Sequence, residues 1–202
     1  MWIGLVCLYG VLKGVRDIIK KKAMEKNSAM EVLFFYTFIS FLFVTPSVKN
    51  ALSIDFHYIG FVMIKSAIIF IAWICSFKAI KKLPIGFYGI MDMSRVIFAT
   101  VLGVTVLGEV MTGHKIAGMA LVLVGLLFVN AKGKGLGEEK AKPIYIVLVL
   151  ISCLCNAVSE LLDKMLMQSM NSGQLQFWYM FFMVILYLGY LSLIHISEPT
   201  RH

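Results

Sequence analysis

The amino-acid sequence predicts an all-α fold, a polytopic transmembrane helical bundle with inverted five-helix repeats. Hydrophobic residues make up 60% of the chain and charged residues only 15%, with a mean hydropathy of +0.87, so the apolar surface exceeds what a soluble domain can bury. The apolar residues also fall into successive runs of about 17 to 25 residues, the length that crosses a bilayer. A weak similarity between the first five runs and the next two predicts the repeats.

Seven runs are long enough to be membrane spans, and we expect each of them to be a helix. Backbone amides within lipid must be satisfied inside their own segment, and the runs lack the alternation of barrel strands. Lysine clusters end the first, third and fifth runs, and most connections are short, so neighbouring helices should pack antiparallel. In chain order, the expected spans cover residues 2–19, 32–48, 56–77, 84–107, 113–131, 144–162 and 175–190.

One segment has the composition of a linker. Residues 132–143, with the sequence KGKGLGEEKAKP, separate a first five-helix repeat (1–131) from the start of a second (144–190). A repeat with an odd number of helices re-enters the membrane in the opposite orientation, which is typical of transporters. At an offset of 143 residues, Gly14, Asp17, Lys21, Phe34 and Tyr36 correspond to Ala157, Glu160, Lys164, Phe177 and Tyr179; a slip of one residue aligns Asn27 and Ser28 with Asn171 and Ser172.

The net charge of +8 comes mostly from lysines in the short gaps between spans. Such lysines fix membrane topology, and this placement argues against nucleic-acid binding. The loops after the first, third and fifth spans hold eleven lysines and the opposite side holds three, which predicts an N-terminus outside the cytoplasm. The four cysteines lie in apolar stretches without metal-site spacing, so we expect no metal ion and no cofactor.

The last residues differ in character from the spans. Residues 191–202 begin with LSLIHISEPTR, and the back-translation of this peptide resembles the transposase adapter used in short-read library preparation. We therefore expect a non-native, adapter-derived tail, with a natural reading frame that continues into further spans. His195 and Ser197 are accordingly left out of the candidate site.

Charged residues within the spans are the candidates for a substrate site. Each is unfavourable by about 2.5 to 3.5 kcal/mol at the centre of a lipid-embedded helix, and such residues usually face a cavity or one another. In the first span, Lys13, Arg16 and Asp17 share one helical face. In the sixth span, Asn156 and Glu160 repeat this spacing, and Glu160 is the expected equivalent of Asp17. The alternatives are an internal ion pair or a side chain that reaches the membrane interface.

The third and fourth spans carry charges at greater depth. Lys65 lies in the third span, with Trp73 two turns further along roughly the same face. The fourth span carries Tyr88, Asp92 and Arg95 at intervals of four and three residues, which lets Asp92 and Arg95 pair. A lone pair facing lipid would still carry the desolvation of two ions. We therefore expect these residues to line a substrate cavity, with Lys65 within reach of the pair.

The sequence contains no Gly-x-Ser-x-Gly elbow, His-Glu-x-x-His pair or phosphate loop, so we predict that the protein is not an enzyme. We expect transmembrane transport of a small metabolite or drug-like solute by alternating access, with the lipid bilayer and a small-molecule substrate as partners. A membrane-embedded lipid-modifying enzyme and a structural membrane subunit are the alternatives. The identity of the substrate, proton coupling and the oligomeric state stay open.

Six residues of the fourth and fifth expected spans and of the turn between them match the motifs of a known family: Pro84, Leu107, Gly108, Glu109, Gly118 and Gly125. With them, the chain up to Tyr190 resembles the EamA-type drug/metabolite transporters, whose repeat ends in a helical hairpin marked by Leu-Gly-Glu and spaced glycines. The first span, with LYGVLKGVRDIIKKKA, is similar to the opening helix of that repeat. The resemblance implies ten helices, of which this chain holds five plus two, in a bacterial inner membrane. It also implies cytoplasmic termini, whereas the lysine count places the N-terminus outside.

Overall fold

Helices fill almost all of the part of the chain that the computed structural model describes, residues 2–52, 54, 56–132 and 142–197. No strand occurs among these residues, which confirms the predicted all-α membrane bundle. The elements are α1 (Trp2–Ala23), α2 (Ala29–Val44), the 3-10 helix η1 (Thr45–Ser47), α3 (Val48–Ala51), α4 (Phe56–Lys82), α5 (Ile85–Asp92), α6 (Ser94–Leu107), α7 (Gly113–Lys132), α8 (Pro143–Leu166) and α9 (Ser172–Ser197).

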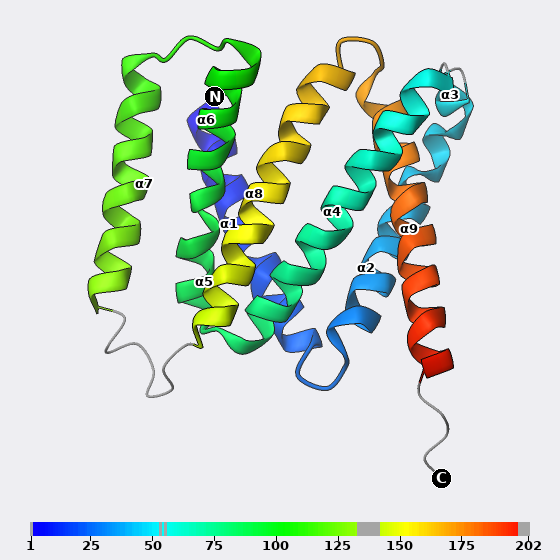
Figure 1. Ribbon diagram of the computed structural model, residues 1–202, viewed down its shortest axis with the longest axis horizontal. Coiled ribbons are helices and arrows are strands. Elements are labelled where there is room, and N and C mark those ends of the chain that lie inside the picture. The colour runs from blue at the N-terminus through cyan, green and yellow to red at the C-terminus, as the bar shows by residue number, and fades with distance from the viewer. Residues whose placement is uncertain (1, 53, 55, 133–141, 198–202) are drawn as a thin grey trace.

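The long helices alternate in direction through the bundle (Figure 1). Helices α8 and α9 run opposite to α1 and α2, which is the orientation that inverted repeats require. Any chain with short turns and four spans between the two helices has this relation, so the repeat itself stays a prediction. The α1–α2 turn lies at the same end of the bundle as the C-terminal end of α4. We call this the lysine-rich end, because it carries Lys20, Lys21, Lys22, Lys26, Lys78, Lys81 and Lys82.

Helix α8 is the centre of the packing. It lies against α4 and α6, and the buried residues along it are mostly small. Small side chains let helices approach closely, and close packing is a main source of helix association in lipid. Helices α2 and α9 also pack together, with the rings of Phe41 and Phe177 5.7 Å apart. The buried residues of α8 are Val149, Ser152, Cys153, Ala157, Ser159 and Leu166.

The outer surface is apolar, as a lipid-facing surface must be. Among the described residues, four helical stretches are long and apolar enough to cross a membrane: His57–Lys82, Ile85–Leu107, Pro143–Leu166 and Ser172–Ser192. Two further apolar helices, Ala29–Val44 and Gly113–Phe128, are shorter. Large apolar side chains are exposed along α1, α6 and α7, for example Val6, Val106 and Leu121.

Helices α2 and α9 begin with the same reciprocal cap. Ser28 Oγ accepts a hydrogen bond from Glu31 N at 3.1 Å, and the Glu31 carboxylate accepts one from Ser28 N at 2.9 Å. Asn171 and Gln174 exchange the equivalent two bonds, both at 2.9 Å. Because these residues follow Ser28 and Glu31 at the offset of 143, the structural correspondence through this turn needs no slip of one residue.

Several predicted spans differ from the structure in their bounds. The first, expected to end at Ile19, continues as α1 to Ala23, and the second, expected over 32–48, is α2 followed by η1 and α3. The fourth span, expected as one helix over 84–107, is divided into α5 and α6 at Met93. The seventh, expected to end near Tyr190, continues as α9 to Ser197, because the residues that follow Tyr190 are largely apolar and contain no helix breaker. Most of the predicted linker (133–141) and residues 198–202 of the expected tail lie outside the described residues.

Candidate functional site

A break in the fourth span lies at the centre of the candidate site. Met93 interrupts the helix, and its N–H donates to the carbonyl three residues earlier at 3.0 Å, which is 3-10 geometry. Ser94 Oγ donates to Met91 O at 2.8 Å, and Cys153 Sγ of α8 lies 3.7 Å from Asp92 O. Side chains thus satisfy carbonyls that a broken helix would otherwise leave unpaired in lipid.

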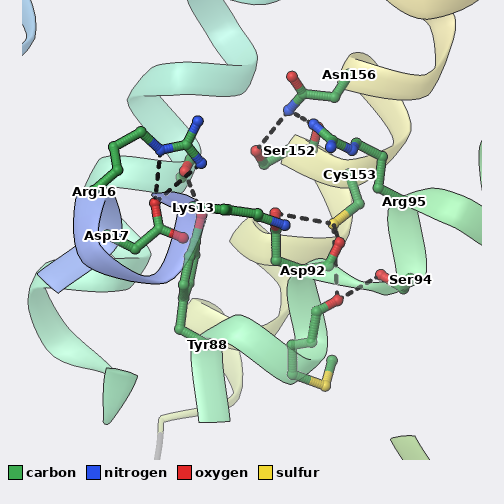
Figure 2. A network of polar contacts seen from close by, with 12 residues as sticks. Lys13, Arg16, Asp17, Tyr88, Asp92, Ser94, Arg95, Ser152, Cys153 and Asn156 are labelled. Atoms are coloured by element: carbon green, nitrogen blue, oxygen red, sulfur yellow. Dashed lines mark hydrogen bonds and ion pairs between the residues drawn. The ribbon is translucent and has the colours of Figure 1, made fainter. Parts of the chain in front are cut away.

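The charged residues beside this break pair with neighbouring helices (Figure 2). Lys13 Nζ of α1 lies 2.7 Å from Asp92 Oδ2, and the two side chains are only 11% and 12% exposed. Arg95 Nε lies 3.3 Å from Glu160 Oε1 of α8. The predicted pairing between Asp92 and Arg95 is therefore wrong: the break at Met93 lies between them, and each finds its partner on another helix.

Three further polar contacts belong to the same cluster (Figure 2). Arg16 and Asp17 pair within α1, with Nη2 and Oδ1 3.1 Å apart; Asp17 is buried and Arg16 is exposed. The hydroxyl of Tyr88 shares a hydrogen bond of 2.6 Å with Ser76 of α4. Asn156 Nδ2 donates to the carbonyl one turn earlier in α8 at 2.7 Å. Helices α1, α4, α5, α6 and α8 therefore all contribute polar groups to one place in the bundle.

These side chains surround a cavity of about 80 Å³, which we call the central cavity. That volume holds a few water molecules, whereas pockets for drug-sized ligands measure roughly 300 to 1,000 Å³. The central cavity as it stands is therefore too small for a drug-sized solute. Seven of the ten predicted site residues line the cavity, namely Arg16, Asp17, Trp73, Tyr88, Asp92, Arg95 and Asn156.

The other three predicted residues lie outside the lining. Lys13 and Glu160 are the ion-pair partners of two lining residues, Asp92 and Arg95 respectively. Lys65 pairs instead with Asp163 of α8 at 2.8 Å. Its expected place beside Asp92 and Arg95 is wrong, because α8 supplies a nearer carboxylate.

The cavity also contains residues that the sequence argument missed, chiefly Lys20, Tyr36, Ser76 and Phe77. Lys20 belongs to a run of three lysines that the hydropathy pattern places in a loop, whereas α1 continues to Ala23. Tyr36 stands out in the sequence only as a position of the weak repeat. The usable signal for Lys20 is helical periodicity extended past the apolar run, since Lys20 lies one turn after Arg16.

Two larger spaces share residues with the central cavity. At the lysine-rich end, the Tyr36 groove of about 550 Å³ is lined by Ala23, Asn27, Glu31, Val32, Phe35 and Tyr36. Near the other end, the Arg95 pocket of about 290 Å³ is lined by Arg95, Val96, Ala99, Thr100, Glu109, Lys115, Glu160 and Lys164. Tyr36 and Arg95 therefore each stand between the central cavity and one outer space.

The Glu109 carboxylate joins the α6–α7 turn to α8. It contacts Lys115 Nζ at 2.9 Å and Lys164 Nζ at 2.5 Å. Hydrogen bonds from Lys164 and then Lys115 hold the pKa of this carboxyl down, at about 2. Glu109 therefore has a structural role, because it links the α6–α7 turn to α8.

Two glycines make the Glu109 contact possible. Gly108 ends α6 with φ at 65°, a left-handed conformation that favours glycine. A Cβ on Gly103 would lie 3.1 Å from Glu109 Oε2, so the absence of a side chain there makes room for the carboxylate.

The polar groups of the cavity can bind a polar solute. In the part of the chain that the structure describes, no group of three His, Cys, Asp or Glu residues is placed to hold a metal ion. The cavity offers ammonium, guanidinium and carboxylate groups between aromatic walls, and these can exchange their present partners for those of a polar solute.

Residues 1–131, which hold all but the last residue of α7 and everything before it, match the EamA-like transporter family. The match includes Lys13, the break at Met93 and Arg95, and it ends before α8. Comparisons with curated proteins and with solved structures each give no match.

Proposed function

The chain belongs to the EamA-like transporter family, membrane transporters of small solutes, and we propose that it carries its solute by alternating access around the central cavity. The observation that supports this most directly is the helix break at Met93 inside an apolar bundle. Broken helices in carriers lie where substrate binds, because irregular backbone is tolerated in a membrane only where it lines a cavity or is buried in protein.

The two outer spaces suggest the route. The Tyr36 groove and the Arg95 pocket lie near opposite ends of the bundle, with the central cavity between them. Arg95 lines both the central cavity and the Arg95 pocket, and its ion-pair partner Glu160 lines the Arg95 pocket. Alternating access requires that this pair opens when the other end closes, and only a solute that binds the two conformations differently can drive such a change.

Cysteine accessibility tests alternating access directly. Asn156→Cys, in a variant whose four native cysteines are replaced by serine, places one thiol on the cavity wall. In sealed vesicles we expect a charged, membrane-impermeant thiosulfonate to modify this cysteine from either side. Gly14→Cys on the same background is the matched control, because position 14 is exposed, a Cβ added there meets no atom within 4 Å, and the thiol should face lipid. Modification of Asn156→Cys from one side only contradicts the proposal.

Transport assays test the residues. Proteoliposomes containing the chain are assayed for uptake of a labelled panel of amino acids, organic acids and amines. We expect Asp92→Asn and Arg95→Gln each to abolish or reshape transport while leaving membrane insertion intact, because both side chains line the central cavity. Unchanged transport kinetics in both variants would show that the ion pairs are only structural. Chemical modification of a lipid by the purified chain would favour an enzyme instead.

A further inference from the structure

We propose that the central cavity selects an organic anion, whose acidic group binds Lys20 and whose apolar part lies along Tyr36. This inference rests on the proposed transport function and names its substrate class. The acidic group is a carboxylate or a phosphate, since both accept hydrogen bonds from an ammonium group.

Lys20 is the cavity cation without a carboxylate partner among the described residues. Its Nζ lies 4.8 Å from the ring centroids of Tyr36 and of Phe77, and 6.0 Å from that of Trp73. Aromatic faces attract an ammonium group, but they leave its hydrogen-bond donors unused. A charged group inside a membrane bundle with three free donors is suited to bind a ligand of opposite charge.

The remaining charges of the cavity neutralise one another. Arg16 is paired with Asp17, and Asp92 is paired with Lys13. Arg95 is paired with Glu160. Lys20 therefore supplies the one excess positive charge among the described groups at the cavity, and a bound anion would balance it.

The adjoining groove has the shape and polarity for the rest of the solute. Tyr36 lines both the central cavity and the Tyr36 groove, so a molecule with its acidic group at Lys20 extends past this ring. Val32 and Phe35 give the groove an apolar wall. The substrate is thus an anion with an aromatic or aliphatic body, rather than a small inorganic ion.

The charge at this end of the bundle supports the same sign of substrate. Besides Lys20, the lysine-rich end carries six lysines, against Glu25 and Glu31. Glu31 is engaged in the cap of α2, where it accepts a bond from Ser28 N. Clefts lined by one sign of charge raise the local concentration of oppositely charged ligands.

The test uses three probes of similar size that differ in charge: benzoate, phenyl phosphate and benzylamine. Their binding to the full chain in lipid nanodiscs is measured by isothermal titration. We expect benzoate, phenyl phosphate or both to bind, and benzylamine not to bind. The ratio of the two anion affinities identifies the acidic group as a carboxylate or a phosphate. Stronger binding of benzylamine, or no binding of either anion, overturns the proposal.

Variants assign the binding to Lys20. Lys20→Gln should weaken anion binding roughly tenfold to hundredfold, the loss of one charge-assisted contact, and Lys20→Arg should retain it. Lys22→Gln is the matched control, because Lys22 is an exposed lysine of the same helix end and is absent from the cavity lining. Equal anion affinity in Lys20→Gln and the unmodified chain overturns the assignment.

The two proposals fail in different ways. If Asn156→Cys is reached from both sides while no anion binds, the carrier mechanism stands and the substrate class is wrong. If anions bind at Lys20 while Asn156→Cys is reached from one side only, the site stands and alternating access is wrong.

Discussion

Helices α1 and α8 both make ion pairs with neighbouring helices, but α8 is also closely packed and α1 is not. Along α8, six buried residues, most of them small, pack against α4 and α6. Along α1, Asp17 is the one buried residue between positions 4 and 23. The contacts of α1 are polar: Lys13 with Asp92, Lys20 over aromatic rings, and Lys21 Nζ donating to Leu83 O.

The difference indicates which helix responds to a ligand. Contacts made by close packing are insensitive to the charge in the cavity, whereas ion pairs depend on it. A solute that competes for Lys20, or that disturbs the Lys13–Asp92 pair, weakens the hold on α1 and leaves α8 in place. We therefore expect α1 to move relative to a fixed α8 during transport.

The largest expected effect is on the α1 contact. Lys13→Met removes the partner of a carboxylate that is only 12% exposed and should lower the free energy of unfolding by about 3 kcal/mol, since an unpaired charge stays in a low-dielectric site. Unfolding in detergent, followed by circular dichroism, measures this. The double variant Lys13→Met with Asp92→Leu should recover most of the loss; failure to recover would mean that α1 is held by something other than the ion pair.

A smaller effect is expected at the packed helix. Ala157 of α8 is 1% exposed, and Ala157→Leu should lower the free energy of unfolding by about 2 kcal/mol through overpacking. Gly14 of α1, at the corresponding position of the predicted repeat, has no atom within 4 Å of an added Cβ. Gly14→Leu should therefore cause no such loss of stability. Equal destabilisation by the two substitutions would remove the contrast between α1 and α8.

The smallest effect concerns the α6–α7 turn and depends on pH. The pKa of Glu109 in the folded state, about 2, lies below the ordinary carboxyl pKa. The contacts of Glu109 with Lys115 and Lys164 therefore contribute their full stabilisation at any pH above the ordinary carboxyl pKa. This stabilisation is lost as the pH falls through about 2. The difference in unfolding midpoint between the unmodified chain and Glu109→Gln should stay constant from pH 7 to pH 5 and shrink towards zero near pH 2. Melting curves of both proteins, recorded by circular dichroism across this pH range, measure the difference. A difference that already vanishes at pH 5 would exclude the double lysine contact.

The bundle could be predicted because hydropathy is a property of each segment alone. The candidate site could be predicted in part for the same reason: charges such as Asp92 and Arg95 stand out within apolar runs. Their partners could not be predicted, because an ion pair between α1 and α5 depends on how distant segments pack. The break at Met93 was missed because no proline marks it and the nearest glycine, Gly89, lies one turn earlier; bonds from Ser94 and Cys153 stabilise it.

The Leu107–Gly108–Glu109 turn, one of the motifs on which the sequence resemblance was based, lies outside the central cavity and makes structural contacts. Gly108 turns the chain, Glu109 fastens the turn to Lys164, and Gly103 leaves room for the carboxylate. A sequence match at this turn therefore indicates a shared contact between helices and gives no information about the transported solute. Sorting relatives by cargo requires the residues at positions equivalent to Lys20 and Tyr36, which a signature of the turn does not contain.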